Sequence, residues 1–227
     1  MIGIIDYDAG NVKSVSKAIE KLGAETVLTA DIEKLDECSA LILPGVGSFG
    51  KAITNLKNAG LDKYIKEAVD SGRLFMGICL GMQILFDKSY EDGEWEGLGL
   101  MPGEVIRFNQ MPDSGFDTSL KIPHMGWNEL IKNRDDAICD NIGDGEYAYF
   151  VHSYYVVPED WNDVVYYADY SVKVPGVVRR GNVIGMQFHP EKSSTTGMKL
   201  LTNFLKEAGE IQVEPKKTEK SGEEEKC

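Results

Sequence analysis

Short apolar runs alternate with amphipathic stretches along the first third of the chain. Four runs have the length and composition of buried strands, and they are residues 2–6, 25–28, 40–43 and 74–78. Between them, apolar residues at helical spacing predict a helix that ends near Leu22 and a helical region over 48–71 with a break at Gly60. Strands that alternate with helices predict an α/β fold with an open, mostly parallel sheet flanked by helices.

The second half of the chain has a different texture. From 93 to 145 it is rich in Gly, Pro and Asn, and the strand candidates from there onward are 104–108, 127–131, 147–151, 164–170, 176–179 and 183–188. We expect them to join the first sheet as antiparallel additions, and a last amphipathic helix covers about 194–207. The prediction is a single domain over 1–210, followed by a disordered charged tail over 211–227 that has too few apolar residues to order itself.

Charge and apolar run length exclude several classes of function. The 227 residues carry a formal net charge of -13, so the phosphate backbone of a nucleic acid would be repelled. No apolar stretch reaches the ~20 residues that span a bilayer, and the N-terminus is strand-like and does not resemble a signal peptide. We therefore expect a cytoplasmic protein that binds neither nucleic acid nor membrane.

The cysteines do not have the spacing of a metal site or a redox motif. They are Cys38, Cys79, Cys139 and Cys227. In a reducing compartment such cysteines are free thiols. We expect neither a metal nor an organic cofactor.

The stretch from Leu74 to Gln83 has the pattern of a nucleophile elbow. An apolar strand meets a sharp Gly-x-Cys-x-Gly turn centred on Cys79, and a helical pattern follows at once. Gly77 and Gly81 have no side chain that could collide where strand and helix pack closely. The thiol would project at the carboxyl edge of the sheet and at the amino end of a helix, which favours a thiolate. The alternative is a buried structural cysteine beside a glycine-rich turn.

A cysteine nucleophile needs a base and a group that orients the base. His189 ends the apolar run 183–188 and is followed by Pro190 and Glu191. A strand that ends in this way holds an imidazole at the edge of the sheet, because Pro190 restricts the backbone. Glu191 can then accept the imidazole N–H and set the tautomer. The alternative is a core histidine at a strand end with a solvated glutamate.

Acyl transfer also needs hydrogen-bond donors for the oxyanion. Pro44-Gly-Val-Gly follows the third predicted strand, next to the strand that carries Cys79. Glycines on both sides of Val46, including Gly47, let its amide turn toward a bound acyl oxygen. The amide of Leu80 at the helix start is the second candidate donor. The alternative is an ordinary turn between a strand and a helix.

These motifs together resemble the class I glutamine amidotransferases, which have a flavodoxin-like α/β fold. The class-level motifs are Gly-Ile-Cys79-Leu-Gly-Met-Gln and Gln-Phe-His189-Pro-Glu191. More narrowly, the chain is similar to the glutaminase subunits of imidazole glycerol phosphate synthases. That similarity is carried by Asp6-Tyr7 with Gly10-Asn11, Pro44-Gly-Val-Gly-Ser-Phe49, Pro123-His-Met-Gly-Trp-Asn128 and Tyr149-Phe-Val-His-Ser-Tyr154. Asp8 stands where the family more often has glycine.

The resemblance implies that the chain hydrolyses glutamine to glutamate and ammonia. Cys79 would attack the side-chain amide, His189 would transfer the protons, and Glu191 would orient His189. By resemblance, the residues that hold the head group of glutamine are Gln83, Glu91, Ser153 and Tyr154. Because Glu91 lies in an acidic loop, its alignment with the family position could slip.

The resemblance also implies a partner, a β/α-barrel cyclase subunit that receives the ammonia and forms imidazole glycerol phosphate in histidine biosynthesis. The chain would then be one half of a heterodimer. The docking face by resemblance comprises Asn11, His124, Met125, Trp127, Asn128, Tyr149 and Lys192. For His124 and His152 we favour interface or structural roles, because neither is followed closely by a carboxylate that could orient it.

Three other functions fit parts of the pattern. Paralogous pairs that amidate surface sugars keep the same site and change the ammonia acceptor. A cysteine peptidase on a similar scaffold would use the same nucleophile and base. A catalytically silent subunit would keep the scaffold only to hold a partner, and the complete set of Cys79, His189 and Glu191 argues against it.

Overall fold

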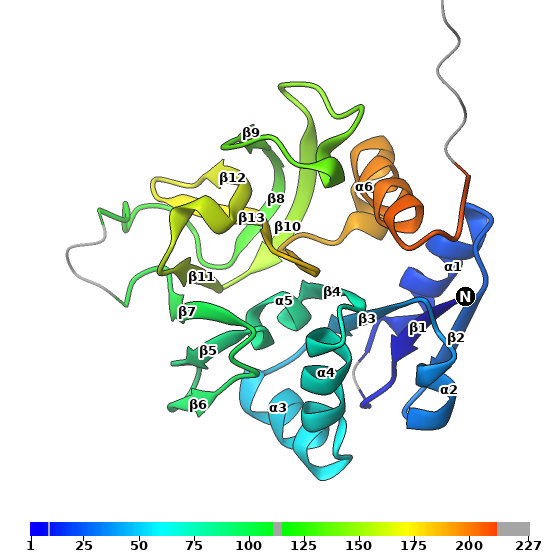
Figure 1. The fold of residues 1–227 in the computed structure, drawn as a ribbon. Coiled ribbons are helices and arrows are strands. Elements are labelled where there is room, and N and C mark those ends of the chain that lie inside the picture. Colours follow the sequence, from blue (N-terminus) through cyan, green and yellow to red (C-terminus); the bar gives the residue numbers. More distant parts are fainter. Residues whose placement is uncertain (9, 111–114, 213–227) are drawn as a thin grey trace, which may run out of the picture.

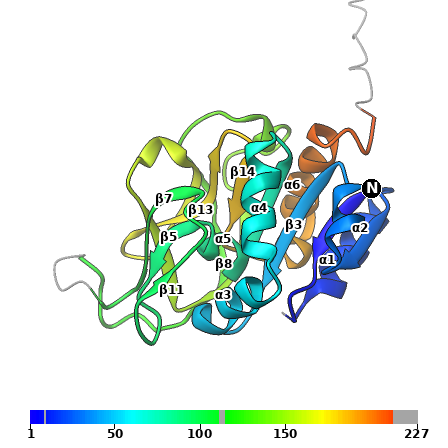
Figure 2. The same ribbon diagram turned by 60° about the horizontal axis from the view of Figure 1, so that its bottom comes forward.

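A sheet of eight strands runs through the protein in the order β2-β1-β3-β4-β14-β13-β12-β9 (Figures 1 and 2). The computed structural model describes residues 1–8, 10–110 and 115–212. Neighbouring strands among the first five in this order are parallel. These strands are β2 (Thr26–Thr29), β1 (Ile2–Ile5), β3 (Ala40–Gly45), β4 (Leu74–Cys79) and β14 (Val183–Met186). The predicted α/β fold with a mostly parallel sheet is confirmed.

The predicted role of the later strands is correct for some and wrong for others. Three antiparallel strands extend the large sheet, namely β13 (Lys173–Arg180), β12 (Val164–Asp169) and β9 (Ile131–Lys132). In contrast, β14 pairs with β4 in parallel, although it was expected among the antiparallel additions. A strand has the same apolar pattern in either direction, so the sequence could not distinguish the two pairings.

Two smaller sheets contain the remaining strands. One pairs β8 (His124–Glu129) with β10 (Tyr147–His152). The other has the order β11-β7-β5-β6, with β11 (Tyr154–Pro158), β7 (Met101–Arg107), β5 (Phe86–Ser89) and β6 (Trp95–Glu96). The expectation that strands 104–108, 127–131 and 147–151 join the first sheet is therefore wrong. They find antiparallel partners of their own.

Helices cover both faces of the large sheet (Figures 1 and 2). The helices are α1 (Val12–Lys21), α2 (Ile32–Asp36), α3 (Phe49–Asn58), α4 (Leu61–Asp70), α5 (Leu80–Ile84) and α6 (Ser194–Glu207). Along β3, Leu41 and Leu43 pack with α3 and α4, whereas Ala40 and Ile42 pack with α1 and α6. Side chains that alternate between two buried faces explain why these strands are apolar at every position.

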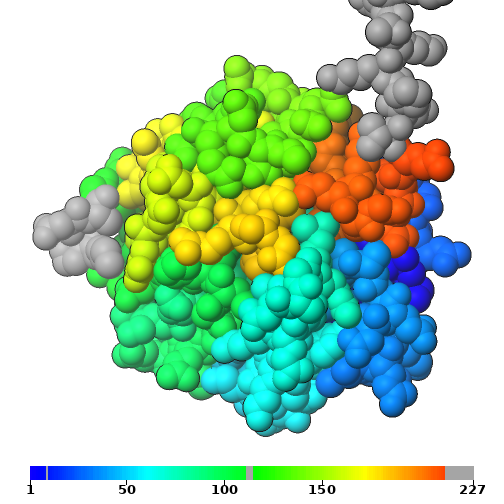
Figure 3. Space-filling view, viewed as in Figure 1, coloured from blue at the N-terminus to red at the C-terminus, as the bar shows by residue number. Residues whose placement is uncertain are grey.

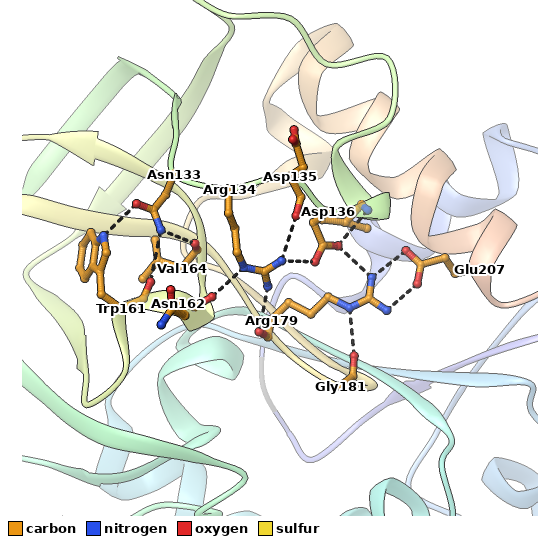
Figure 4. Close-up of polar contacts among 11 residues, drawn as sticks. Asn133, Arg134, Asp135, Asp136, Trp161, Asn162, Val164, Arg179, Gly181 and Glu207 are labelled. Carbon is orange, nitrogen blue, oxygen red and sulfur yellow. Dashed lines mark hydrogen bonds and ion pairs between the residues drawn. The ribbon is translucent and has the colours of Figure 1, made fainter.

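A network of ion pairs ties the last helix to the sheet (Figure 4). Arg179 on β13 binds Asp136 at 3.0 Å and Glu207 on α6 at 2.7 Å, and Arg134 binds the other oxygen of Asp136 at 2.7 Å. Asp136 caps the short 3-10 helix Ala137–Cys139. The planar guanidinium suits this bridging role because its donors point toward two carboxylates at once.

Segments that are distant in the sequence form one continuous surface (Figure 3). The end of α4 meets the turn between β13 and β14, where Asn182 donates hydrogen bonds to the carbonyl oxygens of Val69 and Arg73, and the orange α6 lies beside the gold segment (Figures 1 and 3). In the described part of the chain, no helix has both the length and the apolar character needed to cross a bilayer. The single domain over 1–210 stays a prediction, and the charged tail lies outside the described residues from position 213 onward.

Candidate active site

The carboxyl ends of β3, β4 and β14 lie side by side and open into a cavity of about 450 Å³. Adjacent parallel strands end at the same edge of a sheet, which is where open α/β sheets bind ligands. The cavity is lined by Val46, Gly47, Cys79, Leu80, Gln83, Glu91, Pro123, Val151, His152, Ser153, Tyr154, His189 and Lys192. All the residues predicted for the oxyanion and for glutamine are in this set, together with Cys79 and His189.

Cys79 occupies a strained turn between β4 and α5. Its backbone has φ 56 and ψ -112, a conformation that is rare for a residue with a side chain. The turn is possible because the residues two positions before and after Cys79 are glycines. A Cβ on Gly81 would lie 1.8 Å from the carbonyl oxygen of Leu43, and one on Gly77 would lie 2.6 Å from the carbonyl oxygen of Gly81. This is the geometry of a nucleophile elbow.

His189 follows β14, the strand beside β4, and its side chain lines the same cavity as Cys79, with which it interacts. On the other side of the ring, Nδ1 lies 3.1 Å from Oε1 of Glu191. Both side chains are buried, with 3% and 2% of their surfaces exposed. The strand end and the short 3-10 helix Pro190–Lys192 thus bring thiol, imidazole and carboxylate into one row.

Asn11 belongs to this row, although it was predicted at the partner interface. Its side-chain amide donates to Oε1 of Glu191 at 2.7 Å and lies 3.3 Å from Nδ1 of His189. The residue has φ 73 at the start of α1, which directs its side chain from the first strand–helix turn. We infer that the amide holds the carboxylate in place. The sequence motif Gly10-Asn11 marked the position but not this role.

The electrostatics of the row favour a charged imidazole. Burial lowers the pKa of His189, but hydrogen bonds to Cys79 and Glu191 outweigh that effect and raise the pKa to about 9. Burial raises the pKa of Glu191, and the contacts with His189 and Asn11 more than reverse this, so the net shift is downward. At neutral pH the row therefore contains an imidazolium between a carboxylate and the sulfur of Cys79.

The dipole of α5 contributes less to the electrostatics at Cys79 than the sequence predicts. The sequence predicts that the amino end of a helix stabilises a thiolate, but α5 has only five residues. A helix of little more than one turn aligns few peptide dipoles. The ring of His189, by contrast, interacts directly with the sulfur of Cys79.

The candidate oxyanion donors lie on two sides of the cavity. Strand β3 continues through Pro44 to Gly45, whereas the sequence analysis ended it at Leu43. Proline is tolerated because β1 pairs with β3 only as far as Ile42, so β3 has no strand partner on that side at Pro44. The next residue, Val46, is 40% exposed and is followed by Gly47 at φ 102, while Leu80 begins α5.

The residues predicted for glutamine binding are connected by hydrogen bonds. Gln83 donates to the carbonyl oxygen of Tyr154 at 3.0 Å and to Oε1 of Gln187 at 3.1 Å. Gln187 is fully buried, and its Nε2 lies 3.9 Å from Sγ of Cys79. Gln187 is a site residue that was not predicted from the sequence, although its place two residues before His189 at a strand end indicates the same edge of the sheet.

Glu91 reaches the cavity from the loop after β5. Its carboxylate accepts a hydrogen bond from the backbone N–H of Phe49, the first residue of α3. Burial raises the pKa of Glu91, and the bond from Phe49 partly offsets this. The acidic loop therefore does place this carboxylate at the wall of the cavity, next to the segment that carries Val46.

The other residues predicted at the partner interface are divided between surface and interior. Met125 and Trp127 on β8 are 61% and 53% exposed, and the ring of Trp127 packs edge-on against Tyr149 at 6.0 Å. Lys192 is exposed at the mouth of the cavity, and Asn128 is half-buried. His124 is a correction: it is the first residue of β8 and is 3% exposed, so its side chain points into the interior and not onto the docking face.

The first prediction concerns the close packing at the elbow. In Gly81→Ala the new methyl group would collide with the carbonyl of Leu43, so β3 or α5 must shift. We expect the free energy of unfolding to fall by about 3 kcal/mol, measured by urea denaturation. Gly143→Ala is the matched control, because no atom lies within 4 Å of its added Cβ and its φ is not positive. Equal stability of the two variants would contradict this account.

The second prediction concerns the charge on His189, whose ring should titrate near pH 9 in the folded protein. Because folding raises this pKa from 6.5, the stability that it contributes is complete below pH 6.5 and is lost as the pH rises through about 9. In Glu191→Gln the pKa should fall. NMR of the histidine rings measures this directly, and the other two histidines should stay neutral from neutral pH upward. A His189 ring that titrates near 6.5 in the wild-type protein would refute the assignment.

Comparison with known proteins places the fold and the site in a family. The family model "Glutamine amidotransferase class-I" matches residues 3–208. The chain is 50% identical over 213 residues to "Imidazole glycerol phosphate synthase subunit HisH" of Bacillus subtilis (strain 168), covering 94% of this chain and 99% of the relative. It is 44% identical over 209 residues to the protein of the same name from Aquifex aeolicus (strain VF5), covering 92% and 97%.

Solved structures show the same architecture. A "Crystal structure of glutamine amidotransferase" superposes with a TM-score of 0.67 at 21% identity, covering 92% of this chain and 98% of that one. The "Structure of PurLQS from Thermotoga maritima" matches with a TM-score of 0.68 at 25% identity, covering 91% and 97%. With the family model and the curated relatives, these matches show that the chain belongs to the class I glutamine amidotransferase family.

Proposed function

We propose that this chain is the glutaminase subunit of an imidazole glycerol phosphate synthase. The observation that supports this most strongly is the buried row of Cys79, His189 and Glu191, in which Cys79 and His189 line a cavity of about 450 Å³. A cavity of this size suits a small polar substrate. Relatives that share about half of the sequence over their full length are named as subunits of that synthase.

The reaction proceeds through a covalent intermediate. The thiolate of Cys79 attacks the side-chain carboxamide carbon of glutamine and forms a tetrahedral oxyanion. The amides of Val46 and Leu80 donate hydrogen bonds to this oxygen. The C–N bond then breaks, the leaving amine takes a proton from the imidazolium of His189, and ammonia departs from a glutamyl thioester.

Hydrolysis of the thioester returns the enzyme to its starting state. His189, now neutral, removes a proton from a water molecule, and the resulting hydroxide attacks the thioester carbon. The C–S bond breaks, and glutamate and the Cys79 thiolate are released with the proton kept on His189. Glu191 and Asn11 hold the ring in one orientation through both halves of the reaction.

The cavity offers complementary groups for the rest of the substrate. Glutamine carries an α-ammonium group, and the carboxylate of Glu91 at the cavity wall is suited to bind it. Gln83 lies near the nucleophile, four residues along the chain, where it can contact the carboxamide. The backbone at Ser153 and Tyr154 lines the cavity beside Gln83, which donates to the carbonyl oxygen of Tyr154.

Ammonia leaves toward a partner β/α-barrel subunit, which uses it in the cyclase reaction. The exposed apolar side chains of Met125 and Trp127, with Tyr149 beside them, form a docking face. Large aromatic side chains of this kind contribute strongly to interfaces. The docking face also includes the half-buried Asn128 and the exposed Lys192, and Lys192 lines the same cavity as the exposed Val46.

The test is glutamate release by the chain mixed with the barrel cyclase subunit, with and without the cyclase substrate. We expect the two subunits to co-purify and the cyclase substrate to raise glutamate release. Cys79→Ala should abolish the activity, whereas Cys139→Ala should retain it, since Cys139 is a buried free thiol that does not line the cavity. A Cys79→Ala complex with unchanged glutaminase activity would overturn the proposal. If the chain does not bind the cyclase but supplies ammonia to another partner that amidates a sugar, its assignment to imidazole glycerol phosphate synthase would be wrong.

A further inference from the structure

A buried chain of hydrogen bonds connects β8 with the wall of the glutamine cavity. Asn128 Nδ2 lies 3.2 Å from His124 Nε2, and His124 Nδ1 lies 3.2 Å from His152 Nε2. His152 Nδ1 lies 2.8 Å from the carbonyl oxygen of Tyr154. The two histidines are 3% and 6% exposed, and neither takes part in the row that contains Cys79.

The chemistry of the end groups fixes the direction of every bond in the chain. A carbonyl oxygen can only accept, so His152 must carry its proton on Nδ1 and donate it to Tyr154. Its Nε2 is then an acceptor, and it receives the Nδ1–H of His124. The remaining nitrogen of His124 accepts from the amide of Asn128, whose Nδ2 also donates to the carbonyl of Asp169 at 2.9 Å.

This arrangement requires both rings to be neutral, because a second proton on either would set two N–H groups against each other. Burial lowers the pKa of His124 to about 4, and burial together with the neighbouring His124 lowers the pKa of His152 to about 3. The ring of His124 is also fixed by stacking, at 4.8 Å from Phe150 and 4.1 Å from Tyr170. The pair is therefore a rigid neutral element.

The carbonyl of Tyr154 joins this chain to the nucleophile. It accepts a second hydrogen bond from Gln83, whose other amide hydrogen goes to Gln187, and Gln187 approaches the sulfur of Cys79. Both amide hydrogens of Gln83 are thus used inside the protein. Its carbonyl oxygen is left as an acceptor at the cavity that Gln83 lines.

We propose that His124 and His152 are positioning residues for the glutaminase reaction. They fix the carbonyl of Tyr154, and this carbonyl holds the side-chain amide of Gln83. The oxygen of Gln83 then points toward a carboxamide N–H of the bound glutamine. If the side-chain amide of Gln83 rotated by half a turn, its NH₂ group would face the N–H of the substrate, and two donors would oppose each other. His152 lines the cavity but cannot serve as a second base for Cys79, since both of its nitrogens are already engaged. The inference rests on the proposed glutaminase function.

Three variants separate this role from simple packing. His124→Phe keeps a flat ring between Phe150 and Tyr170 but removes the donor to His152. His124→Asn restores a donor, because its side-chain amide nitrogen can take the place of Nδ1. Tyr170→Phe is the matched control: it keeps the ring on His124 and removes a hydrogen bond to Lys121 that lies outside the chain.

The measurement compares two alkylations of Cys79 in the full chain with the cyclase subunit present. Iodoacetamide reports the reactivity of the thiol alone, whereas a chloroketone analogue of glutamine also reports how the substrate is positioned. In His124→Phe we expect the rate with the analogue, divided by the rate with iodoacetamide, to fall about tenfold, the equivalent of about one hydrogen bond. In His124→Asn most of the ratio should return, and in Tyr170→Phe it should be unchanged.

Other outcomes decide against the proposal or against the function on which it rests. An unchanged ratio in His124→Phe, or an equal fall in Tyr170→Phe, would show that the histidines only pack and would leave the glutaminase function intact. Wild-type protein that reacts with iodoacetamide but not with the analogue would refute the glutaminase function itself. A ratio in His124→Asn as low as in His124→Phe would refute the donor role of His124.

Discussion

The buried ion pair between His189 and Glu191 is the interaction on which the rest of the site depends. With 3% and 2% of these side chains exposed, a charge on either would be very costly without the other. Together they hold a positive ring against the sulfur of Cys79, and Asn11 steadies the carboxylate from the start of α1. The site therefore needs three segments of the chain in register, and a shift in any of them would leave a buried charge unpaired.

The parallel sheet provides that register. β4 ends in the nucleophile, and its neighbours β14 and β3 end in the base and in the loop that carries an oxyanion donor. The close approach of α5 to β3 at Gly81 holds Cys79 in a backbone conformation that the residue would not adopt by itself. The strain is thus maintained by packing, which places the sulfur at the cavity before any substrate arrives. A substrate therefore meets a nucleophile whose backbone position is already set.

Much of this arrangement could be predicted from sequence, because local patterns carried it. The apolar strands, the glycines around Cys79 and the His189-Pro-Glu ending all act over a few residues. Pairing between distant strands could not be predicted, so β7, β8 and β10 were assigned to the wrong sheet. Likewise, the contacts of Asn11 with His189 and Glu191 could not be predicted, since they depend on a positive φ at the start of α1 that the local pattern does not reveal, whereas its place on the docking face stays a prediction.

Buried polar side chains were the other feature of the site that could not be predicted from the sequence. Gln187 and His124 look unremarkable in the sequence, yet each is inside the protein with its hydrogen bonds satisfied by residues far along the chain. Burying such groups is costly unless partners are supplied, so their presence marks places where geometry matters more than packing alone. Here those places surround Tyr154 and Gln83, at the wall against which a substrate would be held.

The most direct test of the account is to trap the covalent intermediate. The chain and its cyclase partner would be mixed with glutamine, quenched in acid within the first turnovers, digested and analysed by mass spectrometry. The account predicts a glutamyl thioester on the peptide that contains Cys79, which is absent when His189 is replaced by alanine. A glutamyl group on Cys38 or Cys139, or glutamate formed with no thioester at any cysteine, would contradict it.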